Sequence, residues 1–409
     1  MIALLGFGKT NQALLELCNH QGTQCLIFDD SFAQIHTDTK QNHYIPSQLF
    51  DQYIHQIDFA IPSPGIPPHH PLIAQSPKLI SEYDYILPNI RQPQIWISGT
   101  NGKTTTTEML EHLLSDFGGV AGGNIGRPLA ELLHLQPKIW ILETSSFTLH
   151  YTHQSTPQIY LLLPLSQDHI SWHKSFGNYT QAKLSPLANM RPDATAIIPQ
   201  QYISHPIAQA SQATIIGYTS EEDLKERFGI DSAIPFDPPF LLDALLAIIG
   251  AKLLTQCDLS AKLQDYRLGA HKMEKILDAR GRLWINDSKG TNIDATIWAL
   301  RTYKHQKVFL ILGGDDKGAD LAPLFAQIRL QEVEILAIGS NASRIQKYAD
   351  RYAIQCTRSL TLDRAVRQIH AHLDHQSVAI LSPAAASLDQ FVSYRQRGER
   401  FVELVKDLS

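Results

Sequence analysis

Short apolar runs alternate with longer helical patterns along the whole chain, and this alternation restricts the fold more than any other feature. Many of the runs are continuous rather than alternating; they read IALL, CLIF, IWIS, IWILE, IYLLLPL, LWIND, VFLILGG, ILAIGS and VAILSP. Continuous apolar runs of this length are typical of strands that are buried on both faces of a parallel sheet. The sequence therefore predicts an α/β fold with mostly parallel sheets.

The chain is too long for one ordinary hydrophobic core, since its 409 residues suggest two or three domains. Two prolines in PNIRQPQ (88–94) indicate one boundary, and LGAHKMEKILDARGR (268–282) separates a very apolar segment from a new series of strands. We predict three domains, over 1–91, 92–268 and 269–409.

Composition and charge exclude several classes of protein. The net charge of -5 and the lack of long runs of like charge argue against a nucleic-acid-binding protein. The four cysteines form no CxxC pair, as expected for reduced thiols in a cytosolic protein. The N-terminus lacks the basic region of a signal peptide, and the most apolar segment, 240–254, is too short to span a bilayer. We therefore expect a cytoplasmic protein without membrane insertion, in which 240–254 is a buried helix.

A loop rich in glycine and threonine, GTNGKTTTT (99–107), lies between a predicted strand and a predicted helix. Backbone N–H groups in such a turn form a cradle for phosphate together with the helix N-terminus. Lys103 is expected to reach the β- and γ-phosphates of ATP, and the Thr104 hydroxyl to bind Mg²⁺. The glycine spacing is shorter than in the usual GxxxxGK[ST] loop, and a plain glycine turn capped by threonines is the alternative. The predicted ATP-binding residues of this loop are Gly99, Thr100, Asn101, Gly102, Lys103, Thr104 and Thr105.

A second nucleotide signal, GFGKTN, follows the first strand of the chain. Gly6 and Gly8 precede a helix, and Asp29 and Asp30 end the next strand, as in a dinucleotide-binding fingerprint. Asn11 stands where the third glycine of that fingerprint would be. A plain turn and a nucleotide site are equally compatible with this pattern.

Three polar residues of the central region each have two interpretations. Glu143 ends the strand IWILE, where it could bind Mg²⁺ or cap the following helix. His169 and Lys183 lie in PLSQDHISWHKSFGNYTQAKLSPL (164–187). On this stretch alone, a solvated surface loop and a lysine that points to water are the simpler interpretation.

Further polar loops follow strands in the C-terminal region. They read NDSKGTN (286–292), GGDDKGAD (313–320) and SPAAASLDQF (382–391). Each could be an ordinary loop with an Asx or Ser cap. Because ligands bind outside the carboxyl ends of strands in α/β sheets, we expect the polar loops of all three regions to form one composite site.

Taken together, these motifs resemble the Mur ligase family, and the resemblance covers essentially the whole chain in the right order. The family marks are GTNGKTTT, GGNIG (122–126), LETSSF (142–147), the DH pair at 168–169, YTQAKL and NDSKGTN. Within the family, LGGDDKGADL and SPAAASLDQFVSYRQRGERF are most similar to the branch that adds D-glutamate to UDP-N-acetylmuramoyl-L-alanine. The resemblance implies Rossmann-like terminal domains around a central P-loop-type ATPase domain.

The resemblance also implies an ATP-dependent amide ligase of peptidoglycan precursor synthesis that works through an acyl phosphate. Its partners would be ATP, the UDP-linked substrate and D-glutamate, its cofactors two Mg²⁺ ions, and the enzyme is expected to be a monomer. The implied catalytic residues are Lys103, Glu143, His169 and Lys183. Lys183 would be carbamylated and would bind metal together with Thr104, Glu143 and His169.

Binding roles follow in the same way. Besides the phosphate loop, the implied ATP contacts are His271, Asp287 and Lys289. The implied contacts to the UDP-linked substrate and D-glutamate are Gly8, Lys9, Thr10, Asp30, Gly65, Asn124, Gly126, Ser145, Thr291, Lys317, Ser387, Leu388 and Tyr394. The chain departs from the family at 240–243, where FLLD replaces asparagines that many members carry.

Three alternatives are compatible with parts of this pattern. One is a ligase of the same fold with another acceptor, such as a folylpolyglutamate synthase. Another is an NAD-dependent oxidoreductase built on GFG, which the missing third glycine disfavours. The third is a nucleotide-binding regulatory module without turnover.

Overall fold

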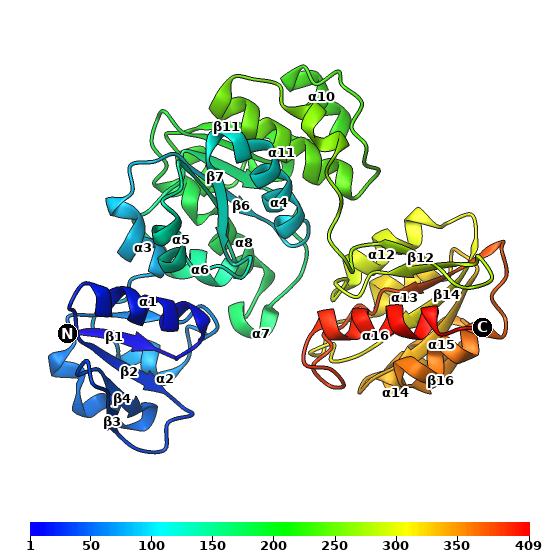
Figure 1. Ribbon diagram of the computed structural model, residues 1–409, viewed down its shortest axis with the longest axis horizontal. Coiled ribbons are helices and arrows are strands. Elements are labelled where there is room, and N and C mark those ends of the chain that lie inside the picture. Colours follow the sequence, from blue (N-terminus) through cyan, green and yellow to red (C-terminus); the bar gives the residue numbers. More distant parts are fainter. The chain divides into compact units, whose positions relative to one another are not determined.

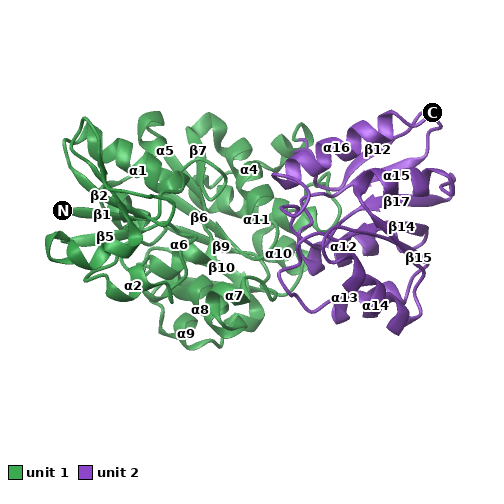
Figure 2. Ribbon diagram, turned by 90° about the horizontal axis from the view of Figure 1, so that it is seen from below, with its two compact units in different colours: residues 1–266 green, residues 267–409 purple.

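The computed structural model describes all residues, 1–409, and contains three sheets in two compact units, Met1–Tyr266 and Arg267–Ser409. Figure 1 labels the elements and Figure 2 colours the two units separately. All nine apolar runs of the sequence contribute to strands. The prediction of an α/β fold with mostly parallel sheets is confirmed. None of the helices combines the length and hydrophobicity that crossing a membrane requires.

The first sheet of unit 1 has the strand order β3-β4-β2-β1-β5, and only the β3–β4 pair is antiparallel. Its strands are β1 (Ile2–Leu5), β2 (Cys25–Asp29), β3 (His36–Thr37), β4 (His43–Pro46) and β5 (Phe59–Pro62). The helices of this part are α1 (Lys9–His20), α2 (Pro71–Gln75) and α3 (Glu82–Ile86). The buried aliphatic side chains of β1 and β2 form its core.

The second sheet of unit 1 is entirely parallel, with the order β11-β10-β9-β6-β8-β7. Its strands are β6 (Gln94–Ser98), β7 (Gly119–Gly123), β8 (Ile139–Glu143), β9 (Ile159–Leu162), β10 (Thr195–Pro199) and β11 (Thr214–Tyr218). The helices are α4 (Lys103–Leu114), α5 (Leu129–Leu135), α6 (Ser146–Tyr151), α7 (Ile170–His173), α8 (Phe176–Leu184), α9 (Pro206–Ala210), α10 (Glu221–Phe228) and α11 (Phe240–Thr255).

Helix α11 contains the apolar segment that we predicted to be a buried helix, and its central residues are buried. It packs along α4, the helix that follows the glycine- and threonine-rich loop (Figure 1). The apolar positions of α4 include Met109 and Leu113, and both are fully buried. The loop is therefore held at the start of a helix that is fixed on its apolar face.

Unit 2 has one sheet with the order β12-β13-β17-β14-β15-β16, in which only β12 is antiparallel to its neighbour. Its strands are β12 (Glu274–Leu277), β13 (Leu283–Asn286), β14 (Lys307–Leu312), β15 (Val333–Ile338), β16 (Cys356–Leu360) and β17 (Ser377–Leu381). The helices are α12 (Ile293–Thr302), α13 (Ala322–Ile328), α14 (Ala342–Tyr352), α15 (Leu362–His370) and α16 (Tyr394–Lys406).

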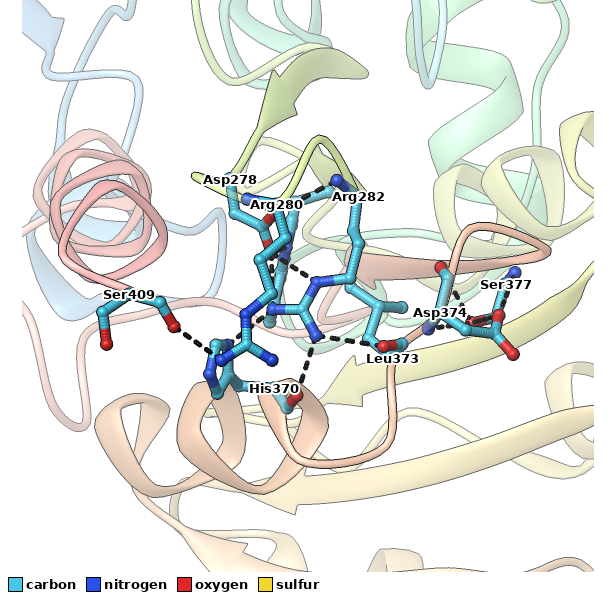
Figure 3. Close-up of polar contacts among 9 residues, drawn as sticks. Asp278, Arg280, Arg282, His370, Leu373, Asp374, Ser377 and Ser409 are labelled. Carbon is cyan, nitrogen blue, oxygen red and sulfur yellow. Dashed lines mark hydrogen bonds and ion pairs between the residues drawn. The ribbon is translucent and has the colours of Figure 1, made fainter.

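A buried ion pair fixes the turn between β12 and β13 (Figure 3). Arg282 Nε donates to Asp278 Oδ2 at 2.8 Å, and its Nη1 donates to the carbonyls of His370 and Leu373 at 2.9 and 3.0 Å. The indole of Trp284 also donates to Asp278 Oδ2, at 3.0 Å. This network anchors the strand whose end carries the NDSKGTN loop.

Candidate active site

The loop between β6 and α4 has a backbone that suits an anion. Gly99 and Gly102 have φ of +147° and +83°, values that strongly favour glycine. A Cβ on Gly102 would lie 2.1 Å from Asp243 Oδ1 of α11, so the loop approaches that helix closely. Lys103 Nζ donates to the carbonyls of Gly99 and Thr100 at 3.0 and 2.8 Å. The resulting loop lies at the N-terminus of a 12-residue helix, where backbone N–H groups attract phosphate.

Lys183 lies in the interior beside this loop, so the interpretation of a lysine that points to water is wrong. Its side chain is buried, and Nζ donates to Ser98 Oγ at 3.1 Å and lies 5.1 Å from the ring centre of Tyr179. The Tyr179 hydroxyl in turn shares a hydrogen bond of 2.8 Å with Thr100 Oγ1. Burial, and then the charge of Lys103, hold the pKa of Lys183 well below its ordinary value. The amine is thereby shifted toward its neutral form.

Glu143 ends β8 next to β6, with Glu143 opposite Ile97 in the parallel register. The carboxylate is buried, and its Oε1 accepts from Asn124 Nδ2 at 2.8 Å. Its Oε2 is buried without a hydrogen-bond partner. A buried carboxylate oxygen of this kind favours a cation or a donor from a ligand. Asn124 N also donates to the Glu143 carbonyl, at 2.9 Å, so the GGNIG loop and Glu143 form one structure.

His169 immediately precedes α7, and its own backbone is in the left-handed conformation, with φ of +52°. Its ring centre is 4.7 Å from that of Phe147 and 6.5 Å from that of Tyr179, the residue that also contacts Lys183. Its Nε2 lies 3.4 Å from Asp168 Oδ2. In the whole chain, no group of three or more His, Cys, Asp or Glu side chains is arranged to hold a metal ion.

The GFGKTN loop of the first sheet is a βα turn closed by an asparagine. Asn11 Nδ2 donates to the carbonyls of Leu5, Gly6 and Ile61 at 3.0, 2.8 and 3.2 Å. Its amide therefore ties together the ends of β1 and β5, at the position where a dinucleotide fingerprint has a glycine. Lys9, two residues before Asn11, donates from Nζ to the carbonyl of Gly126 in the GGNIG loop.

The other predicted residues of unit 1 lie in nearby loops and helix starts. Thr10 is in the first turn of α1, and the Asp30 carboxylate contacts Ser47 Oγ and lies 3.6 Å from His70 Nε2. The Gly65 carbonyl accepts from the Trp172 indole at 3.3 Å, and Ser145 caps α6.

Three loops of unit 2 lie at one edge of its sheet, because β13, β17 and β14 are neighbours and parallel. Arg397 of α16 joins two of them. Its guanidinium is buried, donates to Ser288 Oγ at 3.0 Å and Ser288 O at 2.8 Å, and donates to the Ala385 carbonyl at 3.2 Å. Ser382 Oγ donates to Asp287 Oδ2 at 2.7 Å. Burial raises the pKa of Asp287 to about 7, in spite of that hydrogen bond.

The remaining predicted residues of unit 2 surround this edge. Lys289 Nζ lies 5.9 Å from the ring centre of Tyr394, and Lys289 N donates to the His271 carbonyl at 3.1 Å. The His271 ring is buried and its Nδ1 is 2.9 Å from Asn286 Nδ2. Thr291, Lys317, Ser387 and Leu388 lie in the same loops; Ser387 is buried, whereas Leu388 is 67% exposed.

Comparison with known proteins places this geometry in a family. Residues 97–231, which contain the phosphate loop, Glu143 and Lys183, match the Mur ligase middle domain. Over 424 residues, the chain is 46% identical to the UDP-N-acetylmuramoylalanine–D-glutamate ligase of Helicobacter pylori (strain HPAG1), with 99% of both chains covered. It is also 46% identical to the protein of that name from Campylobacter jejuni (strain RM1221), with 100% of both chains covered.

The chain belongs to the Mur ligase family. Solved structures agree in fold at low sequence identity. MurF from Acinetobacter baumannii has a TM-score of 0.61 at 17% identity, and the match covers 98% of this Mur ligase and 90% of that chain. MurC from Thermotoga maritima has a TM-score of 0.58 at 14% identity, with 98% of both chains covered.

Several buried residues of this Mur ligase were not indicated by its motifs. Arg397 stands within the tail motif RQRGERF, yet nothing in that motif indicates that its guanidinium is buried. His173 is buried, and its Nε2 lies 2.9 Å from Ser146 Oγ. Burial lowers the pKa of His173 to about 4, so its buried imidazole is neutral at pH 7. The alternation of apolar and polar residues around both positions gives no signal of burial.

Proposed function

We propose that this Mur ligase adds D-glutamate to UDP-N-acetylmuramoyl-L-alanine at the expense of ATP, in peptidoglycan precursor synthesis. The observation that carries the proposal is the end-to-end similarity, at 46% identity, to two proteins with that name. The phosphate loop and the neighbouring Glu143 and Lys183 support ATP-dependent activation of a carboxylate. The loops at the edge of the unit 2 sheet, which include the LGGDDKGADL and SPAAASLDQF motifs, support D-glutamate as the acceptor.

The chemistry has two steps. A carboxylate oxygen of the UDP-linked substrate attacks the γ-phosphorus of ATP, the bond to the bridging oxygen breaks, and ADP leaves. The amine of D-glutamate then attacks the acyl carbon, phosphate leaves, and the amine loses a proton. The N–H groups of residues 99–103 and the Lys103 ammonium would stabilise negative charge on the transferring phosphoryl group. These N–H groups are already oriented toward the developing charge, whereas water molecules would have to reorient at a cost in free energy.

Lys183 would act as a carbamate. The lone pair of the neutral lysine nitrogen attacks the carbon of CO₂ and forms an N–C bond, while one C=O π pair moves onto oxygen. The nitrogen then releases a proton, so that an anionic carbamate replaces the neutral amine. The buried position of Lys183 and its lowered pKa support this reaction, because both favour the neutral amine. The carbamate would add two oxygens close to Ser98 and Tyr179.

A magnesium ion is part of the same proposal. It would be held by the unpartnered Glu143 Oε2, the Thr104 hydroxyl, a Lys183 carbamate and the His169 imidazole. The first three are oxygen donors, which Mg²⁺ prefers. Two Mg²⁺ ions would neutralise charge during phosphoryl transfer.

We assign roles to the three parts of the chain in the same proposal. Residues 1–91 would bind the UDP-linked substrate through Gly8, Lys9, Thr10, Asp30 and Gly65. Residues 92–268 would bind ATP. They would also bind the peptide end of the UDP-linked substrate through Asn124, Gly126 and Ser145. Residues 269–409 would contribute His271, Asp287 and Lys289 to ATP and Thr291, Lys317, Ser387, Leu388 and Tyr394 to D-glutamate. The enzyme would work as a cytoplasmic monomer.

An acceptor panel tests the proposal. ADP release is measured with ATP, Mg²⁺ and UDP-N-acetylmuramoyl-L-alanine, in the presence of D-glutamate, L-glutamate, meso-diaminopimelate or L-lysine. We expect turnover with D-glutamate only. Turnover with another acceptor would assign a different ligase activity, and ATP binding without turnover would favour a regulatory module. Lys103→Ala should abolish ADP release while the protein remains folded, which shows that the measured activity belongs to this site.

A further inference from the structure

Helix α3 carries three polar residues in its first turn, and all three are buried. Glu82, Tyr83 and Asp84 are 7%, 1% and 8% exposed. The helix precedes the phosphate-loop strand in the chain, and Ser81 caps it by accepting from Asp84 N at 3.0 Å. Burial of two carboxyl groups and a phenol side by side is costly unless their polar atoms are bonded. The partners of these side chains therefore indicate what the turn does.

Glu82 holds the end of the GGNIG loop. Its Oε1 accepts from the backbone N–H groups of Leu129 and Ala130, at 2.9 and 3.4 Å. These two residues begin α5, and α5 starts only three residues after Gly126. Burial raises the pKa of Glu82 to about 8, although both N–H groups lower it. The contact thus ties the C-terminal end of the loop to α3.

Tyr83 supports the start of the same loop and the end of β8. Its hydroxyl donates to the Glu143 carbonyl at 3.4 Å, the same carbonyl that accepts from Asn124 N. A Cβ on Gly123 would lie 2.8 Å from the Tyr83 hydroxyl and 2.5 Å from the Glu143 carbonyl oxygen, so the three groups are in close contact. The Tyr83 ring also packs edge-on against Trp96 of β6, at 5.0 Å between centres.

Asp84 holds the segment that follows α6. Its carboxylate accepts from three successive backbone N–H groups, those of His153, Gln154 and Ser155, at 2.7, 3.1 and 2.7 Å. Helix α6 begins three residues after Glu143, so Asp84 fixes the far end of the element whose near end carries that carboxylate. Glu82 and Asp84 therefore restrain both structures that meet at Glu143.

We propose that Glu82, Tyr83 and Asp84 are positioning residues that hold Glu143 and the Asn124–Gly126 loop in the arrangement that binds the UDP-linked substrate. The role rests on the proposed function, because it assigns that substrate to the loop. The loop needs such support, since Gly123 and Gly126 both have positive φ. Lys9 of α1 adds a contact to the Gly126 carbonyl. Side chains from outside the site, bound to its backbone, restrict the loop without touching the substrate.

Steady-state kinetics of full-length variants tests the positioning role. Glu82→Ala removes the acceptor for two buried N–H groups and should raise KM for UDP-N-acetylmuramoyl-L-alanine about tenfold. KM for ATP should stay within about twofold, because Glu82 accepts from the N–H groups that begin α5 and not from the phosphate loop. Glu82→Gln keeps an acceptor oxygen and should restore most of the lost affinity. Glu226→Ala, at an exposed glutamate of α10, is the matched control and should change neither constant.

Hydrogen exchange of the free enzyme supplies a readout that needs no turnover. Exchange at residues 123–130 should accelerate in Glu82→Ala and Tyr83→Phe but not in Glu226→Ala. If Glu82→Ala fails to fold, Tyr83→Phe decides by the same two measurements. Unchanged KM for the UDP-linked substrate together with unchanged exchange at 123–130 in folded Glu82→Ala or Tyr83→Phe would overturn the positioning role. Failure of the proposed function shows separately, as a wild-type enzyme that does not turn over with D-glutamate.

Discussion

Replacement of Asp278 by asparagine tests the buried ion pair that anchors β13. The side chains of Asp278 and Arg282 are 1% and 5% exposed, so solvent screens their attraction little. Hydrogen bonds from Arg282 and Trp284 lower the pKa of Asp278 from 3.8 to about 2, against the effect of burial. Lowering the pKa from 3.8 to about 2 corresponds to about 2–3 kcal/mol of unfolding free energy at neutral pH. Because asparagine keeps one acceptor oxygen but leaves the Arg282 charge uncompensated, we expect unit 2 to lose about 2–3 kcal/mol.

The pH dependence of this loss has a definite sign. The folded-state pKa of Asp278 lies below the unfolded value, so its stabilisation is fully present above about pH 4 and disappears as the pH falls toward 2. The difference between wild type and Asp278→Asn should therefore be largest at pH 7 and shrink between pH 4 and pH 2.

The loss is measured as the unfolding free energy of unit 2 alone. Hydrogen exchange of the amides in β13, β14 and β17 of the full-length protein gives this quantity at pH 7. Calorimetric melting of the two proteins between pH 7 and pH 2.5 follows the difference with pH. Asp363→Asn is the matched control: it breaks an Arg400–Asp363 pair of 2.5 Å whose side chains are 40% and 36% exposed, and should cost less than about 1 kcal/mol. Equal losses for the two variants, or a difference as large at pH 2.5 as at pH 7, would refute the reasoning.

Three further predictions concern the candidate active site. Lys183→Ala should abolish turnover, and a short carboxylic acid such as formate or acetate should restore part of it, as judged by ADP release; no restoration by any short acid would contradict the carbamate. Gly102→Ala should raise KM for ATP about tenfold, because alanine in the left-handed backbone conformation costs about 1–2 kcal/mol and its Cβ would clash with Asp243. An unchanged KM for ATP would show that ATP binding does not need the close approach of the loop to Asp243. Arg397→Met should raise KM for D-glutamate more than Arg397→Lys does, while KM for the UDP-linked substrate stays constant. The reason is that Ser288 and the Ala385 carbonyl, in two of the loops, lose the donor that holds them. Equal effects on KM for both substrates would indicate a general loss of stability.

The strands and the phosphate loop could be predicted because their signals are local. A continuous apolar run buries itself in any parallel sheet, and glycines before a helix form an N–H cradle whatever surrounds them. Strand β7, with the sequence GVAGG, gave no such signal, since three of its five residues are glycine. It forms because β8 offers a parallel edge beside it, which only the folded chain supplies.

The environment of each site residue could not be predicted in the same way. Lys183 is buried against Tyr179, four residues earlier in α8, and against Ser98 of β6. The i,i+4 spacing places Tyr179 on the same helix face, but no spacing in the sequence indicates the contact with Ser98. The family resemblance supplied its role, whereas the structure supplied the physical reason why its amine can be neutral. The sequence did not indicate the burial of the polar residues in α3. Their side chains bind backbone groups of other segments, and every residue has such groups, so no motif marks the partners.

The same choice of partners has a consequence for how freely the neighbouring loops can vary. Glu82 and Asp84 contact main-chain N–H groups only, so these contacts place no requirement on which side chains residues 153–155 carry. Saturation mutagenesis should find positions 153 and 154 permissive to nearly every amino acid except proline, which has no N–H to donate. Position 155 is more restricted, because the Ser155 hydroxyl also donates to the Tyr83 carbonyl at 3.0 Å. Substitutions should instead be poorly tolerated at positions 82 and 84, because these two carboxyl side chains hold the backbone of loops whose own sequences can vary.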